Sequence, residues 1–295
     1  MMTRASTKRG ARATLVWLSS VLVTLLGTGS MSLAASEAKP LKVCLLAFNA
    51  PYSTRAEERG FDLDTARAVA SHLSRPLEIE WTDNDPHIEE FDDSDFPLRK
   101  LAKGACDVIF SVPGPAGDTM RESPTLTLGA NYYGAAFELL SCDSAAPKAL
   151  RALRGMSIGI QSQTIAHFAA LMVKAKPASY FSLDAALVGL QKHETDAALL
   201  WGPTTGWRLS QTKSEAAKVC GFVAGYEPPA AVSWNLAVAT RKEDEALRKG
   251  IDAALTDLNT QGELKRIAAR HGVPLRAPFE RTYSLGALND LQQGR

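Results

Sequence analysis

Short apolar runs alternate with amphipathic stretches in the first hundred residues after position 40. Three runs have the length and apolar character of strands: residues 41–48 (LKVCLLAF), 77–81 (LEIEW) and 106–112 (CDVIFSV). Between them, residues 60–73 and 96–102 carry apolar side chains at helical spacing, and Asp62 or Asp64 would cap the longer helix. This order of strands and helices is typical of a parallel sheet with crossover helices.

The alternation continues through the second half of the chain. Strands are predicted at residues 132–140, 156–160, 196–200, 219–223 and 233–240. One helix is predicted at residues 165–175, a second starts near Ser182, and a long amphipathic helix starts at Asp244, which would cap it. Gly262 interrupts the long helix, and Gly272 ends the helix that follows.

The order of these elements predicts two lobes. One α/β unit comes first, a crossing strand leads to a second α/β unit, and the last strand returns the chain to the first unit. We therefore predict an α/β fold with two α/β lobes joined by a two-strand hinge. The expected parts are residues 41–137 and 234–275 for lobe 1, 138–233 for lobe 2, and 276–295 for a polar, loosely packed tail.

The first 34 residues have the pattern of a secretory signal peptide. A basic start is followed by a short apolar core at residues 13–27 and by the small residues of Ser32-Leu33-Ala34. The core is shorter than the roughly 20 residues that a membrane-spanning helix needs, and no later run reaches that length. We therefore expect cleavage of residues 1–34, export to the periplasm, and a mature chain without stable membrane insertion.

The charge balance gives no sign of a nucleic-acid partner. The chain has 33 basic and 32 acidic residues, and residues 1–34 hold four of the basic and none of the acidic ones. The expected mature chain therefore carries a net charge of −3. Proteins that bind nucleic acid show a basic surplus on one face, which this composition does not indicate.

Four cysteines are expected to form disulfides in an exported protein, because their number is even. Three pairings are possible. The strand order favours Cys44–Cys106, since these residues start two strands that can be neighbours in a parallel sheet, together with Cys142–Cys220. No CxxC motif indicates a zinc or redox site.

Four segments of the chain resemble the family 3 periplasmic solute-binding proteins. They are GFDLDTARAVASHL (60–73), KGACDVIFSV (103–112), SIGIQSQT (157–164) and DAALLWGP (196–203). The resemblance extends over residues 41–275. It implies a periplasmic-binding-protein fold of type II, in which the two lobes close on a small ligand that is commonly an amino acid.

A narrower branch of that family is more similar still. The chain resembles the binding proteins associated with quinoprotein dehydrogenases, the MxaJ/XoxJ type, in three features: the cysteines of VCLLAF and CDVIFSV, the sequence Trp201-Gly202-Pro203, and the final segment at residues 244–274. Members of that branch accompany dehydrogenases that use pyrroloquinoline quinone. The acidic run at residues 83–95 departs from the family pattern, and it lacks the spacing of a calcium loop.

Ligands in open α/β sheets bind at the carboxyl ends of strands, and this rule selects the candidate ligand contacts. They are Tyr52, Ser111, Pro113, Gln163, Thr164 and Trp201. Gln163 and Thr164 also begin a helix, whose free N–H groups favour an anion. Each candidate has a structural alternative: an aromatic ring packed within its lobe, a buried hydroxyl, or a plain helix cap formed by Ser162 or Thr164.

The position of Trp201 indicates which class of ligand the protein binds. In amino-acid binders of the resembling family, an acidic residue follows the second-lobe strand and holds the ligand's ammonium group. Trp201 stands at that place here and offers a flat apolar face with one N–H donor. The resemblance therefore argues against a free α-amino acid as the ligand.

These features predict a periplasmic solute-binding protein that closes on a small organic ligand or assists a quinoprotein (methanol or alcohol) dehydrogenase. The alternative is an ABC-transporter receptor for a small polar solute such as an amino acid. A third hypothesis is a cyclohexadienyl-dehydratase-like enzyme. The enzyme would need an acid–base pair in the cleft, and no carboxylate or histidine is predicted at the strand ends. We therefore expect no catalytic residue, metal or cofactor. The expected partners are a small molecule and either the dehydrogenase, its cytochrome c or an ABC permease.

Overall fold

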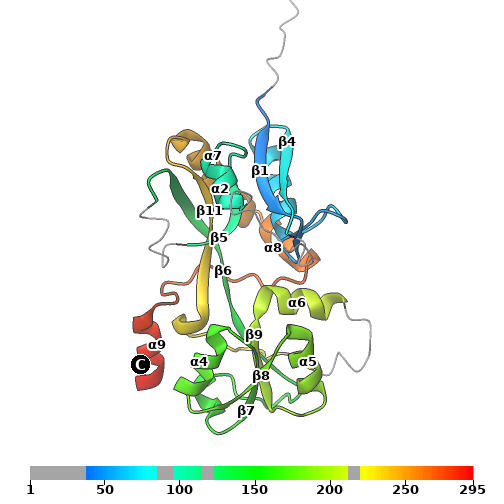
Figure 1. The fold of residues 1–295 in the computed structure, drawn as a ribbon, viewed down its shortest axis with the longest axis vertical. Coiled ribbons are helices and arrows are strands. Elements are labelled where there is room, and N and C mark those ends of the chain that lie inside the picture. The colour runs from blue at the N-terminus through cyan, green and yellow to red at the C-terminus, as the bar shows by residue number, and fades with distance from the viewer. Residues whose placement is uncertain (1–37, 85–95, 115–122, 212–219, 295) are drawn as a thin grey trace, which may run out of the picture. The chain divides into compact units, whose positions relative to one another are not determined.

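The computed structural model describes residues 38–84, 96–114, 123–211 and 220–294 (Figure 1). The predicted signal peptide and all but the first two residues of the acidic run 83–95 lie outside this part of the chain. No helix within it is both long and apolar enough to cross a membrane.

The first α/β unit has the predicted order. Strand β1 (Leu41–Leu46) pairs in parallel with β4 (Leu77–Thr82), and helix α1 (Phe61–His72) connects them. Two short strands, β2 (Phe48–Asn49) and β3 (Ser53–Thr54), form a hairpin in the loop after β1, and α2 (Pro97–Ala102) precedes β5 (Ile109–Pro113). A parallel bridge between Val43 and Val108 places β1 beside the start of β5.

Two long strands connect this unit to the second. Strand β6 (Leu126–Ser141) pairs over its first part with β11 (Ser233–Arg241) and over its last part with β9 (Ala197–Trp201). On its other side β11 pairs with β5. The strands β6 and β11 therefore form the predicted two-strand connection, and Figure 1 shows them running from the β5 region toward β9.

The second α/β unit is built on three parallel strands in the order β9, β7, β8. Its remaining elements are η2 (Leu150–Leu153), β7 (Ser157–Gln161), α4 (Ile165–Met172), β8 (Lys176–Tyr180), α5 (Leu183–Gln191), α6 (Gly202–Gln211), β10 (Gly221–Phe222) and η4 (Ala230–Val232). The sequence did not predict β8 or α6. Strand β8 lies at a sheet edge, where half-exposed residues and a proline are tolerated, so it lacks the apolar run used for prediction. Helix α6 begins with Gly202-Pro203, and this pair is typical of a turn after a strand. Proline is also favoured in the first turn of a helix, which is its place here.

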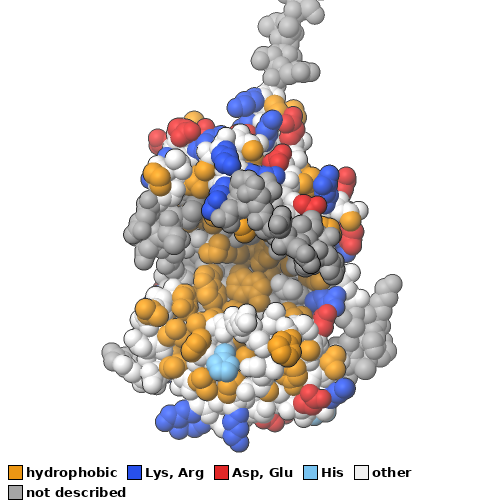
Figure 2. Space-filling model, viewed as in Figure 1, with side chains coloured by type: hydrophobic (Ala, Val, Ile, Leu, Met, Phe, Trp, Pro, Cys, Tyr) orange, Lys and Arg blue, Asp and Glu red, His pale blue; other side chains and the backbone are white. Residues whose placement is uncertain are grey.

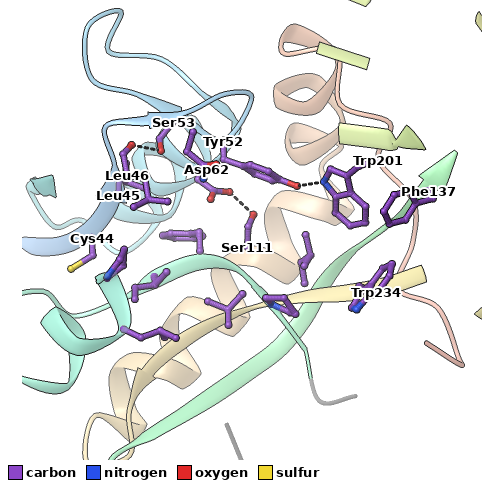
Figure 3. A pocket seen from close by; sticks show the side chains of 18 residues that line it. Cys44, Leu45, Leu46, Tyr52, Ser53, Asp62, Ser111, Phe137, Trp201 and Trp234 are labelled. Carbon is purple, nitrogen blue, oxygen red and sulfur yellow. Dashed lines mark hydrogen bonds between the residues drawn. The ribbon is translucent and has the colours of Figure 1, made fainter. Parts of the chain in front are cut away.

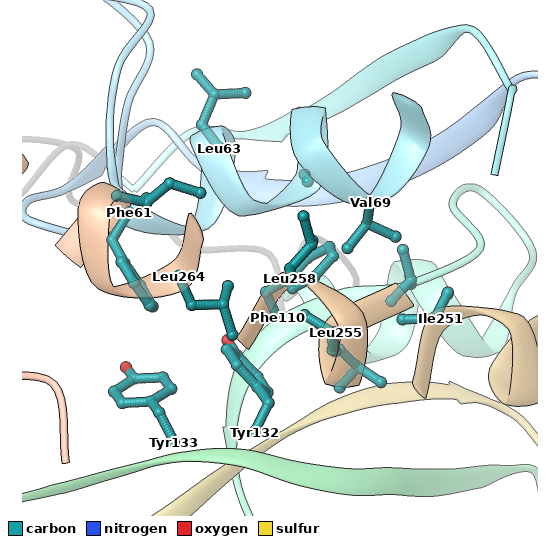
Figure 4. Close-up of a cluster of buried hydrophobic side chains, with 14 of the residues drawn as sticks. Phe61, Leu63, Val69, Phe110, Tyr132, Tyr133, Ile251, Leu255, Leu258 and Leu264 are labelled. Atoms are coloured by element: carbon teal, nitrogen blue, oxygen red, sulfur yellow. The ribbon is translucent and has the colours of Figure 1, made fainter. Parts of the chain in front are cut away.

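The largest hydrophobic cores of the two lobes are separate. The first lies between α1, the β5–β11–β6 strands and the C-terminal helices α7 (Glu245–Thr260) and α8 (Glu263–Arg270), and it contains Phe61, Tyr133 and Leu255 (Figure 4). The second surrounds β7 and β9 and contains Ile158 and Leu199. Because each lobe has its own core, the lobes are joined mainly through their connecting strands.

Both predicted disulfides are present. Cys44 at β1 is bonded to Cys106, just before β5, and Cys142 after β6 is bonded to Cys220 before β10. Each bond lies within one α/β unit, as the strand order indicated.

The predicted caps of two helices are wrong. Helix α1 starts after Gly60 without a side-chain cap, because Asp62 and Asp64 make other contacts. Asp244 does not cap α7 either, since its carboxylate forms an ion pair with Arg241 at 2.6 Å. Gly60 is required by backbone geometry: its φ is +148°, and a Cβ there would lie 2.2 Å from the carbonyl oxygen of Tyr52.

The expectation of a loosely packed tail is also wrong. Residues after Pro274 run along the connecting strands and end in helix α9 (Leu285–Gln293), which buries Ala287 and Leu291 against the second core. Arg276 in this segment makes two hydrogen bonds to the carboxylate of Glu138 in β6, at 2.6 and 2.8 Å. Glu138 is 4% exposed and the Arg276 side chain is 25% exposed, so the tail contributes a half-buried ion pair to the connection between the lobes.

Candidate functional site

A cavity of about 460 Å³ lies where the carboxyl ends of β1 and β5 face the end of β9. Its lining comes from those strands, the loop at Tyr52, the first turns of α1 and α2, and the strands β6 and β11. Figure 2 shows hydrophobic side chains gathered in a hollow on this face of the molecule. The position agrees with the rule that ligands bind beyond the carboxyl ends of the strands of open α/β sheets.

Four of the six candidate ligand contacts line this cavity. Tyr52, Ser111 and Trp201 come together from segments far apart in the sequence (Figure 3). Pro113 lines the same cavity. The other two, Gln163 and Thr164, are not among its lining residues. They follow β7, and because β7 and β9 are parallel they share a sheet edge with Trp201. The predicted cap at this helix is wrong, since the Thr164 hydroxyl donates to the carbonyl of Gln161 instead.

A carboxylate that the sequence had assigned as a helix cap forms the polar end of the cavity. Asp62 is 5% exposed and accepts a hydrogen bond from the Ser111 hydroxyl at 2.5 Å (Figure 3). The hydroxyls of Tyr132 and Tyr133 lie 3.1 and 3.2 Å from the same Ser111 oxygen. The Tyr132 oxygen also accepts from the Ser111 backbone N–H. Ser111 therefore connects one carboxyl to two buried tyrosines.

Burial changes the acidity of this cluster. It raises the pKa of Asp62 to about 7, although the hydrogen bond from Ser111 acts in the opposite direction. Burial also raises the pKa of Tyr52, Tyr132 and Tyr133 above the ordinary tyrosine value, so these hydroxyls stay neutral. The polar end of the cavity thus contains one group that changes charge near neutral pH.

Aromatic rings form the opposite wall. Trp201 lies 5.5 Å from Phe137 and 5.7 Å from Trp234 between ring centroids, both in edge-to-face geometry. The Trp201 indole N–H donates to the Tyr52 hydroxyl at 3.2 Å. Trp201 also contacts both hydrophobic cores, so it joins the two lobes across the cavity.

Sequence reasoning missed Asp62, Phe137 and Trp234 as site residues. A signal existed for Asp62, because it lies four residues before Ala66 and seven before Val69, on the apolar face of α1. A carboxylate on the buried face of a helix indicates either a buried partner or a site. Phe137 and Trp234 lie inside strands whose apolar pattern indicated only burial, and pairing of β6 with both β9 and β11 brings them to the cavity.

The raised pKa of Asp62 predicts a pH-dependent stability. Folding raises this pKa from 3.8 to about 7, so between these values the folded chain holds a proton that the unfolded chain releases. The stability from this group is fully present below about pH 4 and is lost as the pH rises through 7. We expect Asp62→Asn to raise the free energy of unfolding at pH 8 by on the order of 1–3 kcal/mol, and by less at pH 5. Urea unfolding at both pH values checks this, and an equal change at both would contradict it.

Comparison with known proteins gives the class of fold. No protein-family model and no curated protein matches the chain. Matching solved structures include the unliganded, open L-cystine solute receptor of Neisseria gonorrhoeae, with 18% identity, a TM-score of 0.64, and 80% of this chain and 93% of that chain covered. MxaJ from Methlophaga aminisulfidivorans matches with 20% identity and a TM-score of 0.58, and the match covers 80% of this chain and 99% of that chain. The second substrate-binding domain of GlnP from Lactococcus lactis, in an open conformation, matches with 15% identity and a TM-score of 0.61. That match covers 80% of this chain and 97% of that chain.

At these identities the similarity establishes the architecture. The chain has a periplasmic-binding-protein-like fold, with two α/β lobes joined by two strands and a cavity at the carboxyl ends of their strands. The fold class predicted from the sequence is therefore confirmed.

Proposed function

We propose that the chain is a periplasmic solute-binding protein whose cavity closes on one small organic ligand. The observation that carries the proposal is the convergence of Tyr52, Ser111 and Trp201 on one cavity from both lobes. Ligand pockets are mostly apolar with a few convergent polar groups, and this cavity combines aromatic walls with the Asp62–Ser111 pair. The expected boundaries of the lobes, residues 41–137 with 234–275 and 138–233, belong to this proposal.

Calorimetric titration with small organic solutes tests this function. Solutes that raise the melting temperature in a screen of alcohols, amines, carboxylic acids and amino acids would be titrated into the wild type, Trp201→Ala and Trp207→Ala. Trp207 lies on α6 and does not line the cavity, so it is a matched control. We expect about a fivefold loss of affinity for Trp201→Ala, since an aromatic contact contributes on the order of 1 kcal/mol, and no loss for the control. Equal effects of the two substitutions would contradict a ligand site at Trp201.

We further propose that the partner is a periplasmic quinoprotein dehydrogenase or its cytochrome c. The resemblance of Trp201-Gly202-Pro203 and of the final segment to the dehydrogenase-associated branch supports this partner, and MxaJ is among the structures that share the fold. An ABC permease is the alternative, in line with the receptor and transporter domains of similar fold.

Surface plasmon resonance with the immobilised full chain separates the two partners. Saturable binding of a purified quinoprotein dehydrogenase or cytochrome c from the same organism supports the first. Saturable binding of only a reconstituted ABC permease from that organism would replace it with the second.

The proposal assigns no catalytic role. The carboxylate at the cavity, Asp62, comes from the first turn of α1, whereas the prediction concerned only the strand ends. General acid–base catalysis by a dehydratase needs an acid and a base placed on the substrate, and Asp62 is the one titratable carboxyl among the described lining residues. Binding without turnover is therefore the function that these residues support best.

A further inference from the structure

We propose that the cavity selects a small organic cation, in which one ammonium group is attached to an apolar or aromatic body that lacks a carboxylate. This proposal rests on the proposed function, because it names the class of ligand that the cavity would bind. It goes further by assigning the ammonium group to Asp62 and the body of the ligand to the rings of Phe137, Trp201 and Trp234.

The first support is the charge of the cavity. Asp62 is the one charged side chain among the described residues that line it, and no Lys, Arg or His is present among them. A ligand carboxylate placed here would face Asp62 without a described counter-charge. A ligand ammonium would instead neutralise a carboxylate that is already desolvated, where ion pairing is strongest.

The second support is the direction of the hydrogen bonds around Asp62. Its Oδ1 accepts the Ser111 hydroxyl proton, and Oδ2 has no hydrogen-bond partner among the described residues. Ser111 has one hydroxyl proton, and the 2.5 Å contact directs that proton to Asp62. The tyrosine hydroxyls beside Ser111 can then donate to it. The Asp62 Oδ2 atom is therefore available to accept a hydrogen bond from a ligand. An ammonium group can donate that hydrogen bond.

The third support is the aromatic wall. Phe137, Trp201 and Trp234 have ring centroids 5.5 to 6.0 Å apart and all line the cavity. The same rings provide the apolar contact area for the body of the ligand.

Isothermal titration calorimetry at pH 8 with four related probes tests the class of ligand. Benzylamine carries the cation, benzyl alcohol is its neutral counterpart, phenylacetate is an anion, and L-phenylalanine is a zwitterion. We expect benzylamine to bind at least tenfold more tightly than each of the others. We expect Asp62→Asn to weaken benzylamine binding at least tenfold and to weaken benzyl alcohol binding much less. Asp64→Asn is the matched control, because Asp64 lies on the same helix but pairs with His271 and Arg270 away from the cavity.

The pH dependence of benzylamine affinity gives a readout that a purely structural role of Asp62 would not produce. Asp62 becomes neutral as the pH falls through about 7, so the affinity should fall by about tenfold per pH unit below pH 6. The other titratable groups that face Asp62 are Tyr52, Tyr132 and Tyr133, whose pKa values lie above the ordinary value and which stay neutral over this range. Asp62→Asn should remove the pH dependence.

The outcomes distinguish the two proposals. If benzyl alcohol or L-phenylalanine binds as tightly as benzylamine, or if Asp62→Asn retains the wild-type benzylamine affinity, the cation proposal is overturned and the cavity remains a ligand site. If no probe binds and no solute of the wider screen binds either, both the cation proposal and the proposed function fail. Tight benzylamine binding that Asp62→Asn and low pH both weaken supports the cation proposal.

Discussion

Arg276→Ala is expected to lower the free energy of unfolding by about 3–5 kcal/mol. The substitution leaves Glu138 buried in β6 without the two hydrogen bonds that Arg276 donates to its carboxylate. A buried charge without a partner destabilises the folded state, because the protein interior solvates a charge less well than water does. Removal of Arg276 leaves this desolvation penalty of Glu138 without a compensating interaction. Urea unfolding followed by circular dichroism measures the change.

Arg281→Ala is the matched control for this prediction. Arg281 lies in the same C-terminal segment and pairs with Asp290, but its side chain is 68% exposed. Exposed ion pairs contribute about 0–1 kcal/mol, so this substitution should change little. A loss of less than about 1 kcal/mol for Arg276→Ala, equal to that of the control, would show that the tail does not stabilise the connection between the lobes.

Removal of the Cys44–Cys106 disulfide by the double substitution Cys44→Ala, Cys106→Ala is expected to lower the free energy of unfolding by about 4 kcal/mol. The bond closes a loop of sequence separation 62 and so restricts the unfolded chain. It also holds β1 to the residues before β5, and the ends of both strands line the cavity. Ligand affinity should therefore fall together with stability.

The second disulfide provides the control. Cys142 and Cys220 have a sequence separation of 78, so their double substitution to alanine should cause a similar loss of stability, about 4 kcal/mol. Neither residue lines the cavity, and ligand affinity should persist. Urea unfolding and calorimetry on both variants check this pair of expectations. Equal effects on affinity would contradict the link between the Cys44–Cys106 bond and the site.

Elements with strong apolar periodicity were predictable from the sequence. The strands around Val43 and Ile158 and the long helix with Ile251 and Leu255 occur close to their predicted positions, because burial of an apolar face decides their structure. The two connecting strands were predictable from element order. The edge strand β8, which buries little, was not.

The tail shows why some tertiary contacts were not predictable. Residues 276–293 have no apolar run as long as those of the predicted strands, and the segment was predicted to be polar and loosely packed. Their order comes from partners distant in sequence: Arg276 binds Glu138, Tyr283 stacks on Trp234 at 5.3 Å, and Asn235 exchanges two hydrogen bonds with Phe279. Local pattern carries no information on such pairs.

The candidate site was predictable only in part, for a related reason. Strand ends identified Tyr52, Ser111 and Trp201, since the topological rule applies to any parallel sheet. Asp62 was assigned to a local role as a cap because acidic residues at a helix start usually have one. Instead it accepts a hydrogen bond from Ser111, 49 residues away, and lines the cavity.

A crystal structure of the full chain with the solute that binds most tightly in the screen would locate the ligand site. We expect the solute in the cavity between Ser111 and Trp201, in contact with the aromatic wall and Asp62. A solute bound elsewhere, for example in the groove between Phe279 and Asp290, with this cavity empty, would contradict this expectation.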